Sequence, residues 1–426
     1  MNLLLRNTEL DLVNHMNNKY KKGLVHYLLI VLLVYSGVYG TASIFLDNAI
    51  FRYAKDILLL FLIFFSACLI FFNNNCRIKI IIAHFYLFLS ITVCGTASLF
   101  FTGGWIEIIY GLKITILPMC MIFVGFILGE GFVKTFYRVN LLLYFGLILC
   151  WIIQYNLGID KLMTLGYEYG VNVKHFNGNP RLPSLVGTPD SYAFLLALLG
   201  IIIEYGYLKE KNVKLSYIIK VSTLVFLILA TIRNALLFWI LFQVVMLVRG
   251  IKKKKVKVKY LAYSVLTFSG MMSVVVFSYL YNKLSSGLFS TTSLVLRLLE
   301  WKKNVPSLLS REGIFGAGLG TVGSASRRIS QIGADSLDIA VDNQFLAFYH
   351  QIGVIGIIFL LIFIILNGIH LKKLVWKNDR QVQTAYILFL VSLVSCFFTN
   401  IYEVFPFNIF LWLYMGISYS YYKNSI

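Results

Sequence analysis

Residues 344–369 read QFLAFYHQIGVIGIIFLLIFIILNGI, an apolar stretch that contains no Asp, Glu, Lys or Arg. With a rise of about 1.5 Å per residue, a helix of this length crosses the hydrocarbon core of a bilayer, which is about 30 Å thick. Lipid offers no hydrogen-bond partner to a backbone amide, so a spanning segment has to be helical. The stretch therefore predicts a transmembrane helix.

The rest of the chain repeats this pattern. Comparable apolar runs occur at 24–40, 57–72, 80–100, 112–128, 139–157, 191–207, 216–232, 234–249, 260–281, 382–400 and 405–422. Together with 344–369 they predict about twelve transmembrane helices. Hydrophobic residues make up 59% of the 426 residues and charged residues 13%, which is more apolar sequence than a soluble core requires. We expect an all-α polytopic membrane protein that forms one transmembrane domain over 1–426.

The net charge of +20 is spread over short segments between the apolar runs. Most Lys and Arg residues fall on one side when these segments are assigned alternately to the two faces of a membrane. Basic residues collect in cytoplasmic loops, so both termini are predicted to be cytoplasmic. The same pattern gives the positive charge a role in membrane orientation, and we do not expect nucleic acid as a partner.

Two longer polar segments, 158–190 and 282–343, fall on the opposite, extracytoplasmic side. Connections longer than about 15 residues without structure of their own are uncommon unless they are functional or disordered. We expect 282–343, between the predicted helices nine and ten, to be a large, partly helical loop that forms a lid and carries chemistry. Its Gly316-x-Gly318-x-Gly320 sequence is interpreted as a flexible turn.

Two arginines lie where the predicted helices meet the outer surface. Arg181 belongs to a proline-rich segment that Pro180, Pro183 and Pro189 stiffen. A guanidinium fixed in this way suits bidentate binding of phosphate, although an arginine at a membrane surface also arises from simple snorkelling. Arg233 falls in a predicted tight hairpin between two apolar runs, where an ionisable side chain indicates function.

The polar segment before residue 344 supplies further candidates. Arg297 has Glu300 and Trp301 at helical spacing, which is also the pattern of an ordinary i,i+3 ion pair. Asp342 and Asn343 directly precede the long apolar run and can cap its helix through the carboxylate. His350 lies about two turns further on, where it either faces the same cavity or is a packing residue with satisfied hydrogen bonds.

The order of these features resembles the O-antigen ligase and polymerase superfamily. The matching features are Arg181, Pro189-Asp190 before a helix, Arg233 in a hairpin, Arg297 with Trp301, the glycine-rich 315–320 segment, and the DNQFL sequence at 342–346. Ligases of this group usually have His where this chain has Asp342, which favours a Wzy-type polymerase. Ile232 replaces the Ser that commonly precedes the hairpin arginine, which puts a hydroxyl role there in doubt.

The resemblance implies a glycosyltransferase of the bacterial cytoplasmic (inner) membrane. Such an enzyme links undecaprenyl-pyrophosphate-linked oligosaccharide repeat units into O-antigen of lipopolysaccharide, capsule or exopolysaccharide, alongside a flippase and a chain-length regulator. The alternatives are an O-antigen ligase and a lipid-linked oligosaccharide flippase. No metal or cofactor is expected, since the six cysteines lack metal-ligand spacing. The candidate catalytic residues are Asp342 and Arg297, and the candidate substrate-binding residues are Arg181, Arg233, Asp190, Asn343 and His350.

Overall fold

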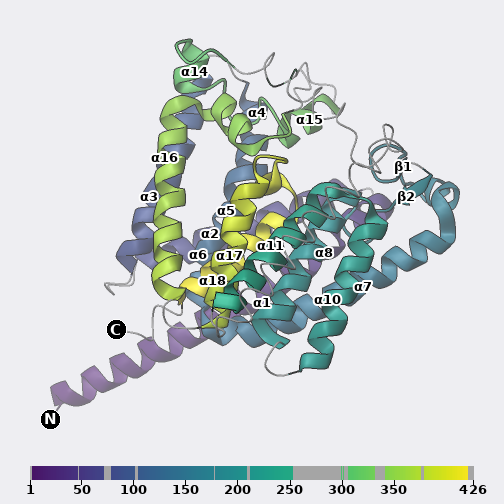
Figure 1. The fold of residues 1–426 in the computed structure, drawn as a ribbon. Helices are drawn as coiled ribbons and strands as arrows, with labels where there is room; N and C mark the ends of the chain where they lie inside the picture. Colours follow the sequence, from purple (N-terminus) through teal and green to yellow (C-terminus); the bar gives the residue numbers. More distant parts are fainter. Residues whose placement is uncertain are drawn as a thin grey trace.

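The protein is a helical bundle whose connections gather at its two ends (Figure 1). The computed structural model describes residues 2–46, 48–71, 78–100, 104–176, 178–208, 212–252, 299, 301, 306–331, 341–375 and 379–420. Within these ranges, seven helices are long and apolar enough to cross a membrane. An all-α membrane protein is therefore confirmed, while the predicted helix at 260–281 lies outside the described residues.

The helices cover most of the predicted apolar runs, and several extend well beyond them; α1 begins at Asn2, where the predicted run begins at residue 24. Their bounds are α1 (Asn2–Phe45), α2 (Ala49–Phe71), α3 (Ile78–Ala97), η1 (Ser98–Phe100), α4 (Trp105–Gly111), η2 (Leu112–Ile116), α5 (Leu117–Met119), α6 (Met121–Leu128), α7 (Glu130–Thr164), α8 (Pro189–Ile203), η3 (Glu204–Leu208), α10 (Val213–Ala230), α11 (Arg233–Lys252), α14 (Arg311–Phe315), α15 (Ser324–Gln331), α16 (Gln344–Val375), α17 (Arg380–Ser395), η4 (Ile401–Glu403) and α18 (Phe407–Ser420). The two short strands are β1 (Lys174–Phe176) and β2 (Asn179–Arg181), which pair antiparallel.

The centre of the bundle is formed by α18 and α8. Every residue of α18 is buried, and α8 is buried along nearly all of its length. A helix that is hydrophobic all round belongs inside a large protein or a membrane. Gly416 of α18 lies so close to Ile122 of α6 that an added Cβ would stand 2.1 Å from the Ile122 carbonyl oxygen. Small residues permit this close helix contact in membrane proteins.

The predicted helix over 112–128 belongs to a longer span, Trp105–Leu128, which is interrupted. It begins as α4, passes through the π-helical turn η2, and continues as α5 and α6. A π turn inserts an extra residue and changes the direction of the side chains, and such turns are frequent at functional sites. Lys113 lies in this turn.

Segments that are distant in sequence meet at one end of the bundle, opposite the amino terminus. Figure 1 shows β1, β2, α4, α14 and α15 there, at the top of the view. The amide of Thr41, near the end of α1, donates to the carbonyl of Leu185 at 3.0 Å. The described parts of the two long polar segments lie at this same end of the helices (Figure 1).

The glycine-rich turn between α14 and α15 is closely packed, which the interpretation as a flexible turn missed. Gly316 and Gly320 are buried and have φ angles of +87° and +85°. A Cβ on Gly316 would lie 2.3 Å from the Gln351 carbonyl oxygen, and one on Gly320 would lie 1.9 Å from the Glu107 carbonyl oxygen. The turn is thus wedged between α16 and α4, and glycine is required by both the conformation and the space.

Candidate functional site

Arg181 is held at the end of β2 by three contacts. Its Nε donates to the hydroxyl of Thr231 at 2.9 Å, and its Nη2 donates to the Thr231 carbonyl at 2.8 Å. The guanidinium also stacks on the ring of Phe176, with 4.1 Å between Cζ and the ring centroid. A guanidinium has five N–H donors, so this fixation through neutral groups leaves further donors for a ligand.

The segment that carries Arg181 is inserted into the bundle. The side-chain amide of Gln154 in α7 both accepts from the Ser184 amide at 2.7 Å and donates to its carbonyl at 2.9 Å. The Ser184 hydroxyl donates to the Leu147 carbonyl at 2.6 Å. The prolines predicted a stiff segment, and these buried hydrogen bonds are the additional cause that the sequence did not reveal.

Arg233 lies close to Arg181. It begins α11 directly after the tight turn at Thr231, which has a left-handed φ of +56°, so the predicted hairpin is confirmed. Burial lowers the pKa of the Arg181 guanidinium, the Asp190 carboxylate raises it, and the charge of Arg233 lowers it. Three of the predicted site residues, Arg181, Arg233 and Asp190, are therefore near enough to interact electrostatically.

Asp190 lies in the first turn of α8. The helix dipole stabilises a negative charge at this position. Its carboxylate is 3.8 Å from the ammonium of Lys174 on β1, and 56% of its side chain is exposed. The N-cap of the helix is Thr188, whose hydroxyl accepts from the Ser191 amide. Asp190 is thus a partly solvated anion beside the arginine pair.

The turn after α17, residues 396–400, connects the arginine pair to the start of α16. The side-chain amide of Asn234, next to Arg233, donates to the Phe398 carbonyl at 3.1 Å. The side-chain amide of Asn343 donates to the Phe397 carbonyl at 3.3 Å. The beginnings of α11 and α16 therefore contact the same short turn, which brings Asn343 and Arg233 into one region.

Asn343 is the residue whose side chain caps α16. Its Oδ1 accepts from the amides of Phe345 at 3.0 Å and Leu346 at 3.1 Å. The sequence predicted that the Asp342 carboxylate caps this helix. The structure corrects this prediction, because the Asn343 amide oxygen accepts these bonds. Asp342, half-buried beside it, remains the acidic residue at the entrance of the helix.

His350 is packed against the glycine-rich turn. Its Nδ1 is 3.5 Å from the Thr321 hydroxyl, and its carbonyl accepts from the Ala317 amide at 2.8 Å. The ring is buried. Of the two alternatives for His350, these contacts favour the packing residue. Arg297 lies outside the described residues, and Trp301, four residues later, is helical.

Glu403 is a buried charged residue that the sequence analysis missed. It lies in η4 with 3% of its surface exposed. Its Oε2 accepts from the Ser324 amide at the start of α15 at 2.8 Å, and its Oε1 accepts from the Gln344 side-chain amide at 3.4 Å. Burial raises the pKa of this carboxyl, while the hydrogen bonds lower it to a smaller degree. In the sequence, Glu403 is an acidic residue between two apolar runs, and this position could have marked it as a candidate functional residue.

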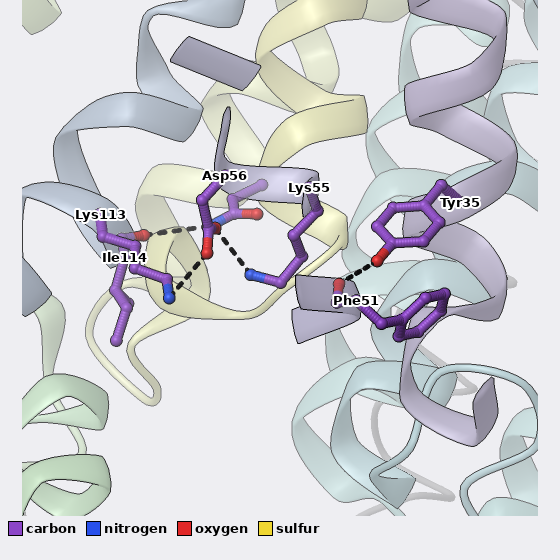
Figure 2. A network of polar contacts seen from close by, with 7 residues as sticks. Tyr35, Phe51, Lys55, Asp56, Lys113 and Ile114 are labelled. Carbon is purple, nitrogen blue, oxygen red and sulfur yellow. Dashed lines mark hydrogen bonds and ion pairs between the residues drawn. The ribbon is translucent and has the colours of Figure 1, made fainter. Parts of the chain in front are cut away.

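A second group of charges was also missed. Figure 2 shows Lys55 and Asp56, adjacent in α2, beside Lys113 of η2. The Asp56 carboxylate is 2.8 Å from the Lys55 ammonium and 2.7 Å from that of Lys113. Lys55 and Asp56 directly precede a membrane-length apolar run. Charged side chains at such a position are energetically costly, so the sequence could have marked them as candidate functional residues.

The described ranges contain no group of three or more His, Cys, Asp or Glu side chains that could hold a metal ion. The chain matches no protein-family model and no curated protein. The function is therefore inferred from the residues of this chain.

Proposed function

We propose that the protein polymerises lipid-linked oligosaccharide repeat units at the outer face of the bacterial cytoplasmic membrane, as an all-α protein of about twelve transmembrane helices with cytoplasmic termini. The observation that carries the proposal is the position of Arg181, which is hydrogen-bonded to Thr231 two residues before Arg233, near the turn that contacts the start of α16. Fixed guanidinium groups suit a pyrophosphate leaving group, because they stabilise negative charge without having to reorganise.

The proposed reaction is a glycosyl transfer between two lipid-linked sugars. The bond between the anomeric carbon of the donor glycan and its pyrophosphate oxygen breaks, and the acceptor sugar hydroxyl forms the new glycosidic bond. Arg181, Arg233 and Arg297 hold the departing undecaprenyl pyrophosphate. Asp342 takes the proton of the acceptor hydroxyl as general base, and Asp190 and Asn343 line the substrate.

The position of Asp342 at the start of α16 bears on its proposed role as general base. A carboxylate at the start of a helix is stabilised in its charged form, which weakens it as a base. The Asn343 cap already satisfies two amides of the first turn, so Asp342 is not required for that task.

Lipid analysis of a strain without this gene tests the proposal. Single repeat units on the undecaprenyl carrier, accumulated in the outer leaflet, are the expected result. Polymer that remains on its carrier would instead identify a ligase. Repeat units confined to the inner leaflet would identify a flippase. Restoration of polymer by the wild-type gene and by the variant Arg138→Lys, on the exposed surface of α7 at the other end, provides the control.

The orientation has its own test. Reporter enzymes fused after Lys174 and after Gly320 should both be active only when exported. Both positions lie at the end of the bundle that carries Arg181 and Glu403 (Figure 1). A cytoplasmic signal from either fusion would contradict a site on the outer face.

A further inference from the structure

A cavity lies at the same end of the bundle, between α2, η2, α15 and η4. Its volume is about 400 Å³, which includes the part open to solvent. The lining consists of apolar residues, the polar Asn408 and five charged residues, which are Lys55, Asp56, Lys113, Arg328 and Glu403. Three cations and two carboxylates from four separate elements therefore face one space.

The two lysines share one carboxylate. Asp56 places one oxygen 2.8 Å from Lys55 and the other 2.7 Å from Lys113 (Figure 2). Glu403 already accepts hydrogen bonds from Ser324 and Gln344. Counting formal charges, three cations against two anions leave a net charge of +1, and protonation of Glu403 would raise it to +2.

Aromatic rings hold the ammonium groups in position. The Lys55 Nζ lies 4.8 Å from the ring centroid of Tyr39 and 4.9 Å from that of Phe405. The Lys113 Nζ lies 5.5 Å from the ring centroid of Tyr110. Cation–π contacts stabilise a cation without neutralising its charge, so the lysines remain available to an anion.

We propose that this cavity binds a phosphoryl group between Lys55, Lys113 and Arg328. An ammonium has three donors and binds phosphate as a point charge, and Arg328 is exposed at the rim, where it can close over the ligand. An anion bound beside Arg328 would compensate the net positive charge of the cavity lining.

Two sources offer this chemistry at a membrane surface. One is the headgroup of an anionic phospholipid, and the other is the pyrophosphate of a lipid-carried substrate. The inference rests on the cavity alone and does not depend on the proposed polymerase activity. A binding experiment with purified protein can therefore fail or succeed independently of that activity.

The experiment uses the full chain in nanodiscs of phosphatidylcholine. Inorganic pyrophosphate is titrated at constant ionic strength, with chloride as the matching salt, and the melting temperature is recorded, since a ligand of the folded state raises it. We expect saturable stabilisation of the wild type. Arg328→Gln and Lys113→Gln should each weaken the apparent affinity by about tenfold. Lys161→Gln, an exposed lysine at the end of α7, should leave it within about twofold.

The lipid source is distinguished in a second arm. Nanodiscs that contain phosphatidylglycerol should reduce the apparent pyrophosphate affinity of the wild type if headgroups occupy the cavity, and should leave it unchanged if they do not. Arg328→Gln keeps the inference testable if Lys113→Gln fails to fold, because its side chain is exposed. Equal stabilisation of wild type and Arg328→Gln, or stabilisation reproduced by chloride, overturns the inference.

Discussion

Arg181 and Lys55 lie at the same end of the molecule but are held in opposite ways. Arg181 is half-buried in a polar segment, and two of its donors bind the neutral hydroxyl and carbonyl of Thr231. Lys55 is buried in the helix bundle and is paired with a carboxylate. A loop can therefore position a cation through neutral groups, whereas this cation on a helix in the bundle lies beside an anion.

Glu403 connects the two regions, so its removal should have the largest effect. Glu403→Ala deprives the Ser324 amide and the Gln344 side chain of their acceptor. Each unsatisfied buried donor costs about 1–3 kcal/mol, so we expect a loss of about 3 kcal/mol in the free energy of unfolding. Tryptophan fluorescence during denaturation measures it. Glu168→Ala, at an exposed glutamate, should change little, and equal losses in both variants would contradict this role.

The same residue predicts a dependence of stability on pH. Burial raises the folded-state pKa of Glu403 above its ordinary value of 4.5, so the folded protein binds the proton more readily than the unfolded chain. This contribution is fully present below pH 4.5 and is lost as the pH rises through the folded-state pKa. Melting temperatures measured upward from pH 4.5 should fall less steeply in Glu403→Gln than in the wild type. Identical slopes would show that another group controls the transition.

Arg181→Lys tests the arginine side of the comparison. Lysine keeps the charge but cannot bind both Thr231 atoms and a phosphate with one planar group. A charge-assisted hydrogen bond contributes about 1.5–3 kcal/mol, so we expect polymer synthesis to fall by at least about tenfold. Gel analysis of polymer from complemented cells gives the readout, with Arg138→Lys as the control. Full-length polymer from Arg181→Lys would show that bidentate recognition is not needed.

The pair Asp342 and Asn343 separates catalysis from capping. Asn343→Ala removes the acceptor of two helix amides and should cost about 1 kcal/mol of stability. Asp342→Asn should change stability by less than about 0.5 kcal/mol and yet leave single repeat units, because an amide cannot act as a base. Protein level by immunoblot and glycan length by gel distinguish the two effects. Normal polymer from Asp342→Asn would remove it from the mechanism.

The sequence predicted the class of fold because lipid imposes a simple rule on every spanning segment. Runs of apolar residues predicted α8, α16 and α18, because this prediction needs no knowledge of how the helices pack. The π turn at Leu112–Ile116 could not be read in this way. Its neighbours are as apolar as those of a straight helix, and a π turn leaves no mark in composition.

The candidate site was predicted in part for a similar reason. Arg181 and Arg233 stand out because charge at the end of an apolar run is costly, and the structure brings them together. Glu403 and Lys113 also carry charge at the end of an apolar run, but 290 residues separate them in the chain. Both residues line the same cavity, and single-sequence reasoning has no means of placing them together, because their positions depend on how the helices pack.

Lys174→Ala should have the smallest effect and sets the baseline of the comparison. The Lys174 ammonium is 3.8 Å from the Asp190 carboxylate, and both side chains are substantially exposed, at 33% and 56%. Water and salt screen such a pair, and exposed ion pairs contribute about 0–1 kcal/mol. We expect a change in stability below about 0.5 kcal/mol and polymer of normal length, because the Asp190 carboxylate stays beside Arg181 in the variant. Denaturation at low and high salt checks this, since only an ion pair that contributes to stability is weakened by salt. A loss of polymer from Lys174→Ala would mean that the exposed lysine binds the substrate, and the arginine pair would then be only part of a wider basic surface.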